Sequence, residues 1–141
     1  FLSSQAGENG VLWLGNTTTG RYTLQVEHNR FENNMPNEES IRVYPSYVIR
    51  WEGNGASYFN NNDFISNITD YLFRSREPLS TDVNAKGNWW GTDDEDAIKS
   101  QIYDYFQNGE YSIVDYSNWQ TEPIASNAGK VGVAANEVGP K

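Results

Sequence analysis

The chain has 141 residues, of which 37% are hydrophobic and 14% aromatic, which is enough for one domain with a substantial core. A formal net charge of -9 argues against nucleic-acid binding, because that binding needs basic residues to neutralise phosphates. No apolar run approaches the roughly 18 residues of a membrane-spanning helix, and the lack of cysteine excludes a disulfide scaffold and a thiolate metal site.

A loose internal repeat covers residues 24–90, where short apolar–polar alternations lead to an asparagine, an aromatic residue two positions later and a second asparagine. The repeated positions are Asn29, Phe31 and Asn34; Asn62, Phe64 and Asn67; and Asn88 and Trp90. The copies are about 33 and about 26 residues apart, which is the range of solenoid coils. We therefore expect an all-β coil, with a β-sandwich that has asparagine-rich turns as the alternative.

The asparagines of the repeat have a physical reason in such a coil. Each coil turns sharply between strands, and asparagine takes the left-handed backbone conformation there at low cost. Its side-chain amide can bond the neighbouring coil, so Asn29, Asn62 and Asn88 are expected to form a ladder. The aromatic residue of each copy is expected to point inward and to stack on the next one.

Residues 88–106 are interpreted as a cap. Trp89 and Trp90 form a bulky aromatic plug whose indole N–H groups need partners. Thr92 followed by Glu95 is a capping-box pattern, and apolar residues at helical spacing continue to Phe106. We predict a short helix over about 93–106 that lies across the end of the coil.

These features together resemble a known family. The repeats, Asn88-Trp89-Trp90-Gly91, the short helix, Ile102-Tyr103-Asp104 and Tyr116-Ser117-Asn118-Trp119 are similar to the C-terminal end of pectin-lyase-like proteins with parallel β-helix repeats. The resemblance covers about residues 20–124. It implies a right-handed parallel β-helix of about three to four coils over residues 1–124, from a secreted or cell-surface protein. A proline is common near Asn118 in that family, so the closing turn of this chain departs from the pattern.

The resemblance also implies coils that precede this chain, which starts at Phe1 and is expected to be a fragment or a processed form. An open coil end would expose strand edges and apolar core. We therefore expect residues 1–20 to stack on another protein chain or on upstream coils of the same precursor. Residues 125–141 are small and weakly patterned, and they are interpreted as a tail or a linker.

Catalytic and metal sites find little support in the sequence. Family enzymes that act on acidic polysaccharides cluster carboxylates on one sheet face, whereas Asp63, Asp70 and Asp82 are dispersed. The lone His28 stands between Glu27 and Asn29 without a triad pattern. The acidic run 93–96 could attract Ca²⁺, but helix capping already accounts for it, so no cofactor or metal is expected.

Two kinds of surface site are candidates. Trp51 and Tyr47 are the first choice for stacking against a sugar, because Arg50, Glu52 and Gly53 beside them suggest a solvent edge. Asn16 and Asn67 begin Asn-x-Thr sequons and are candidates for N-glycosylation.

The sequence thus favours a non-catalytic structural, adhesive or ligand-presenting module of an extracellular protein, with a polysaccharide or glycan as its ligand class. The alternatives are part of a polysaccharide-active enzyme and a dedicated carbohydrate-binding module.

Overall fold

The computed structural model describes residues 5–6, 12–15, 23–36, 45–53, 55–75 and 82–128. The strands are β1 (Gln5–Ala6), β2 (Leu12–Gly15), β3 (Leu24–Gln25), β4 (Arg30–Glu32), β5 (Met35–Pro36), β6 (Tyr47–Glu52), β7 (Ser57–Tyr58), β8 (Asp63–Ile65), β9 (Tyr71–Arg74), β10 (Val83–Asn84), β11 (Ile102–Tyr103) and β12 (Val114–Asp115). The helices are α1 (Glu95–Ser100) and the 3-10 helix η1 (Ala125–Asn127). The fold is β-rich with one short α-helix, as predicted. Within the described ranges no helix is long and apolar enough to cross a bilayer.

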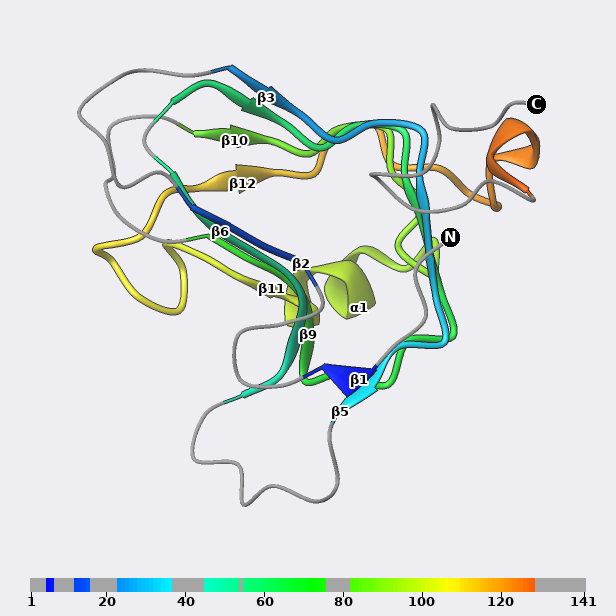
Figure 1. Cartoon of the computed structure of the whole chain (residues 1–141), viewed down its shortest axis with the longest axis horizontal. Coiled ribbons are helices and arrows are strands. Elements are labelled where there is room, and N and C mark those ends of the chain that lie inside the picture. The colour runs from blue at the N-terminus through cyan, green and yellow to red at the C-terminus, as the bar shows by residue number, and fades with distance from the viewer. Residues whose placement is uncertain are drawn as a thin grey trace.

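The strands of the described residues pair in parallel throughout. Two four-stranded sheets have the orders β12-β10-β7-β3 and β11-β9-β6-β2, and two-stranded sheets are formed by β4 with β8 and by β1 with β5. Strands that are consecutive in sequence lie in different sheets, so the chain passes from one sheet to another and then returns beside its earlier path (Figure 1). We call one such passage a circuit.

The circuits differ in length but keep a common register at one bend. Asn29 and Asn62 are 33 residues apart, whereas Asn62 and Asn88 are 26 residues apart. The pairing Phe31↔Phe64 and the bridge Asp63↔Trp89 nevertheless align the three passages. The extra residues therefore lie outside this bend.

An aromatic stack runs through the interior at this bend. The ring centroids of Phe31 and Phe64 are 5.3 Å apart, those of Phe64 and Trp90 are 4.9 Å apart, and the planes are within 13° and 7° of parallel. All three side chains are fully buried. The plug is thus made by Trp90 alone, since Trp89 is only half-buried. Trp90 Nε1 has no hydrogen-bond partner, so the expected partner for this indole is missing.

Helix α1 is shorter than predicted, and it is capped differently. It ends at Ser100 because Ile102 and Tyr103 pair with Phe73 and Arg74 of β9 instead of continuing the helix. The Asp94 side chain accepts a hydrogen bond from the Ala97 amide at 2.9 Å, so Asp94 is the N-cap.

The predicted capping-box residues have other partners. Thr92 Oγ1 accepts a bond from the Asp94 amide at 3.1 Å, and Glu95 accepts one from the Tyr116 hydroxyl at 3.1 Å. The fully buried Ile98 joins α1 to the core, and Figure 1 shows the helix within the outline of the strands. This position suits a cap.

Candidate functional site

The bend that follows β3, β7, β10 and β12 forms a regular corner. It has a positive φ at His28 (59°), Asn61 (56°), Gly87 (74°) and Asn118 (56°). These four residues are aligned, because the amides of His28, Asn61 and Gly87 bond the carbonyls of Asn60, Lys86 and Ser117. Left-handed backbone costs an ordinary residue about 1–2 kcal/mol and costs glycine or asparagine less. The left-handed conformation was predicted for the ladder asparagines, which is wrong, because each of these asparagines directly follows the left-handed residue.

The ladder itself connects three circuits. Asn62 Oδ1 accepts the Asn29 amide at 2.9 Å, and Asn88 Oδ1 accepts the Asn62 amide at 2.8 Å. The nitrogens of Asn62 and Asn88 donate to the carbonyls of Val26 and Phe59 at 2.8 and 2.6 Å. All three asparagines are buried. Each side chain thus satisfies backbone groups that the sharp bend leaves without strand partners.

A second, shorter ladder lies at the next bend and involves a sequon residue. Asn67 Oδ1 accepts bonds from the amide and side chain of Asn34 at 3.1 and 2.8 Å, and Asn67 Nδ2 donates to Phe31 O at 2.9 Å. The nitrogen that a glycan would modify is therefore part of the fold. Asn16 lies outside the described residues.

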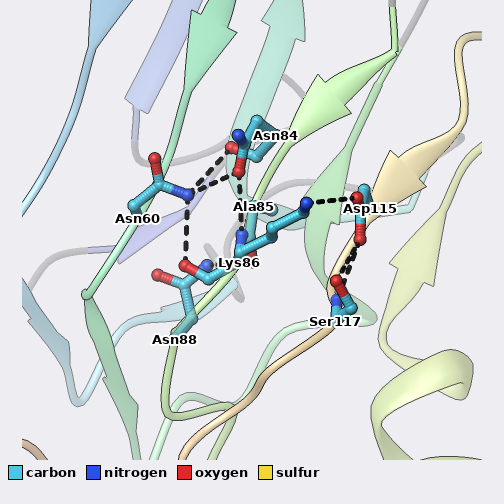
Figure 2. Close-up of polar contacts among 7 residues, drawn as sticks. All are labelled: Asn60, Asn84, Ala85, Lys86, Asn88, Asp115 and Ser117. Carbon is cyan, nitrogen blue, oxygen red and sulfur yellow. Dashed lines mark hydrogen bonds and ion pairs between the residues drawn. The ribbon is translucent and has the colours of Figure 1, made fainter.

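A polar network of side chains lies next to the corner and connects neighbouring circuits (Figure 2). Asn60 Nδ2 donates to Asn84 Oδ1 at 2.7 Å and to the Lys86 carbonyl at 3.1 Å. Lys86 Nζ lies 3.3 Å from Asp115 Oδ2, and the Ser117 hydroxyl donates to Asp115 Oδ1 at 2.7 Å. Although partial burial acts to raise it, the hydrogen bonds from Ser117 and the charge of Lys86 hold the pKa of Asp115 below its usual value. The network therefore joins three circuits with its charges compensated.

The β11-β9-β6-β2 sheet has a contrasting column of side chains, which we call the arginine column. Trp13, Arg50, Arg74 and Tyr103 are register neighbours on four successive strands. Trp13 is 54% exposed, with the Arg50 guanidinium 5.5 Å from its ring centroid. Arg50 is neutralised by Glu52, whose Oε1 accepts from Nε at 2.7 Å. The column therefore places two half-buried arginines in one row with the exposed ring of Trp13.

Arg74 is held by tyrosines instead of a carboxylate. Its guanidinium carbon lies 5.1, 5.7 and 5.3 Å from the rings of Tyr47, Tyr103 and Tyr111. It donates to the hydroxyls of Tyr111 at 2.7 Å and Tyr47 at 3.3 Å, while its Nε has no acceptor. No described carboxylate forms an ion pair with it. The positive charge of Arg74 is thus stabilised by the faces of tyrosine rings and has no carboxylate partner among the described residues.

The predicted sugar-stacking residues do not form an exposed platform. Tyr47 is 2% and Trp51 is 6% exposed. A Cβ on Gly53 would collide with the Trp51 ring, so the ring folds over this glycine and no solvent edge is formed. Neighbours in a strand point to opposite faces, and the charged Arg50 and Glu52 therefore face away from Trp51. Trp13 is exposed and Arg74 is half-buried, and neither residue was among the predicted stacking residues.

The carboxylates proposed for comparison with enzymes are placed apart. Asp63 is buried beside Ile124, Asp70 accepts bonds from the amide and hydroxyl of Ser46, and Asp82 is exposed. Among the described residues no group of three or more metal-ligating side chains is found. His28 is exposed at the corner. The acidic run 93–96 begins α1 and contains its N-cap.

Two hollows lie near the end of the described chain. One of about 490 Å³ is lined by Lys99, Ile102, Asp104, Phe106, Gln107 and Tyr116. Burial raises the pKa of Asp104, although amide bonds from Val114 and Phe106 oppose this. The other hollow, of about 440 Å³, lies at the corner beside His28, Asn61, Gln120, Glu122, Pro123, Ile124 and Ala125.

Comparisons with known proteins give no relative: no family model matches the chain, and neither a curated protein nor a solved structure is detectably similar to it.

Proposed function

We propose that this chain is part of a right-handed parallel β-helix and serves as a rigid, non-catalytic module of a secreted or cell-surface protein. The observation that carries this proposal is the asparagine ladder, in which Asn29, Asn62 and Asn88 bond one another across circuits of unequal length. Parallel strands that return to the same sheet by a crossover are connected with the right hand in about 98% of cases, which supports the proposed hand.

A structural role is supported by how the corner uses its polar groups. The ladder side chains are buried and bonded to backbone, and Asp115 and Lys86 neutralise each other. Catalysis needs groups that are free to exchange protons or to bind a reacting atom. A corner whose groups are committed to one another is suited to hold a shape for adhesion or ligand presentation.

Native-state hydrogen exchange tests this proposal. The amides of Asn29 and Asn62 should exchange only through global unfolding, since both donate to buried ladder oxygens. The same protein, incubated with acidic and neutral polysaccharides, should release no reducing ends or unsaturated products. Fast exchange at both amides would contradict the rigid solenoid, and polysaccharide cleavage would favour the enzyme alternative.

A carbohydrate-binding role is the second candidate, and the arginine column favours it. An exposed indole can stack on a sugar ring, and an uncompensated guanidinium can bind a carboxylate or sulfate in bidentate fashion. Trp13 and Arg74 supply these two groups on one sheet. We expect an acidic oligosaccharide to change the intrinsic tryptophan fluorescence, and a neutral one of equal length to have a smaller effect.

The matched variants are Trp13→Ala and Arg74→Gln, with Phe106→Ala as a control that removes an exposed ring outside the column. The first two should weaken binding at least tenfold, and the control should bind like the unmodified protein. Equal binding by all four proteins would exclude the column as the sugar site.

The N-terminal end of the coil is proposed to stack on a partner. Strands β2 and β3 are terminal in their four-stranded sheets, so each leaves one edge without a described neighbour. Such edges favour pairing with a further strand, from upstream coils or from another chain. Light scattering with intact mass spectrometry of the native assembly tests this, because a cooperatively folded 16.0 kDa monomer would contradict it.

A further inference from the structure

The C-terminal segment 120–127 returns to the corner and is attached there by three hydrogen bonds. The amide of Gln120 donates to Asn88 O at 2.9 Å, and the amide of Ile124 donates to Asp63 Oδ1 at 2.9 Å. Asn127 Nδ2 then donates to Asn61 O at 2.8 Å. Figure 1 shows η1, in orange, beside the bend that the circuits share. Asn127, which belongs to the segment predicted to be a tail or a linker, thus contacts the corner, while 129–141 lie outside the described residues.

Two oxygen atoms in this contact have no hydrogen-bond donor. They are Asp63 Oδ2 and Asn127 Oδ1, and both are buried with their residues 1% and 0% exposed. The other polar atom of each side chain is bonded across the same contact, to residues 124 and 61. An unpaired buried acceptor costs about 1–3 kcal/mol, and a buried ionised carboxylate costs more. Two orphan acceptors in one contact therefore require an explanation.

Turning the Asn127 amide over does not remove the problem. Its oxygen would then face the carbonyl oxygen of Asn61, which is an acceptor as well, so in either orientation the Asn127 oxygen lacks a donor. A single proton on the Asp63 carboxyl supplies it, because a protonated carboxyl donates through one oxygen while the other still accepts the Ile124 amide.

We propose that Asp63 is protonated in the folded protein, that its Oδ2–H donates to Asn127 Oδ1, and that this proton latches segment 120–127 onto the corner. The proposal does not depend on the function proposed above. The charged groups around the carboxyl are few. Arg30 is its register neighbour on β4 and is paired with Glu32 at 3.2 Å, while His28 and Glu122 line the adjoining hollow.

The electrostatics are consistent with this state. Burial raises the pKa of Asp63, opposed by the Ile124 amide, the Asn127 side chain and the Arg30 charge. The net direction is upward, which favours a protonated carboxyl.

The latch has a defined pH dependence. In the released segment Asp63 is solvated and has an ordinary pKa near 3.9, so release between that pH and the raised folded pKa frees one proton. The latch is strongest below the ordinary pKa and is lost as the pH rises through the folded pKa. In that interval the population of the released state should rise about tenfold per pH unit.

Nuclear magnetic resonance of the full chain tests the latch. The ¹³C shift of the Asp63 carboxyl and the exchange protection of the Ile124 amide should be followed from about pH 3 to about pH 8, which spans the ordinary aspartate pKa. We expect a protonated carboxyl well above the ordinary pKa, and protection of Ile124 that falls with pH after correction for intrinsic exchange. The Asn62 amide, which bonds Asn88 in the ladder, should stay protected and serves as the internal control.

Asp63→Asn is the matched variant, because a carboxamide accepts from Ile124 and donates to Asn127 at every pH. It should keep Ile124 protected at the high end of the range and remove the pH dependence. An Asp63 carboxyl that is ionised across the range, with constant protection of Ile124, would overturn the proposal. The titration of the unmodified protein decides this even where the variant does not fold.

Discussion

The corner and the arginine column are both rows of side chains in register, yet their polar groups are satisfied in opposite ways. At the corner Asn62 is fully buried and bonds residues of the circuits on both sides. In the arginine column Trp13 is exposed and Arg74 has tyrosine rings where an ion pair would be expected. A row that closes on itself stabilises the fold, whereas a row with spare charge remains available for a ligand. The predictions below test this difference.

Asn62→Ala should have the largest effect. It removes the oxygen that accepts the Asn29 amide and the nitrogen that donates to the Val26 carbonyl, and both of these backbone groups are in the buried ladder. At about 1–3 kcal/mol for each such group, the free energy of unfolding should fall by about 2–6 kcal/mol. Urea denaturation measures this. A matched change outside the ladder is Asn108→Ala, which removes only an exposed bond to the Glu110 amide. Equal losses in both variants would contradict the ladder's role.

Gly87→Ala tests the row of left-handed residues at the corner, which comprises His28, Asn61, Gly87 and Asn118. The φ of 74° costs a residue with Cβ about 1–2 kcal/mol, and the new Cβ would lie 2.5 Å from Asn61 Oδ1. His28→Gly is the complementary change, because it relieves the same strain at the aligned position and should leave the protein equally or more stable. Thermal unfolding of the two variants measures whether each change lowers or raises the stability. A destabilised His28→Gly protein would argue against backbone strain at this position.

Arg74→Met tests the arginine column. Removing the guanidinium deletes its contacts with the rings of Tyr47, Tyr103 and Tyr111, at a cost of about 1 kcal/mol. The loss should thus be much smaller than at Asn62, while binding of an acidic oligosaccharide should be abolished. Calorimetric titration and urea denaturation of one preparation compare the two effects. A loss as large as that of Asn62→Ala would make Arg74 a structural residue.

Asp115→Asn should have the smallest effect. The lowered pKa of Asp115 means that its contribution to stability is present above the unfolded pKa and is lost as the pH falls through the folded pKa. Both partners of the Lys86 pair are more than a third exposed, so the contribution is below about 1 kcal/mol. The difference in the free energy of unfolding between Asp115→Asn and the unmodified protein should vanish at low pH. If the difference persists there, it arises from packing instead of from the charge.

The sequence predicted the spacing of the ladder asparagines better than the backbone conformation of the corner. Asn29, Asn62 and Asn88 could be aligned because one residue type recurs and a side-chain amide is needed at each circuit. The left-handed position before them is filled by His28, Asn61, Gly87 and Asn118, which share only a tolerance of positive φ and so show no pattern. A proline could not adopt the φ of 56° that Asn118 has.

The arginine column was missed for a different reason. Its members come from four circuits, and their register is set by strand pairings such as Arg50↔Arg74 that no local pattern encodes. The same pairings ended α1 at Ser100, although apolar spacing predicted a helix to Phe106, which is 76% exposed. Long-range pairing thus overrode local periodicity in both places.

The corner has a consequence for how such a chain can change in length. Asn62 and Asn88 occupy equivalent points 26 residues apart, each preceded by a left-handed residue. Removing residues 62–87 would join Asn61 directly to Asn88 and recreate the same local sequence logic with one circuit fewer. The stretch from one ladder asparagine to the next is therefore a unit that could be deleted without requiring a new type of turn.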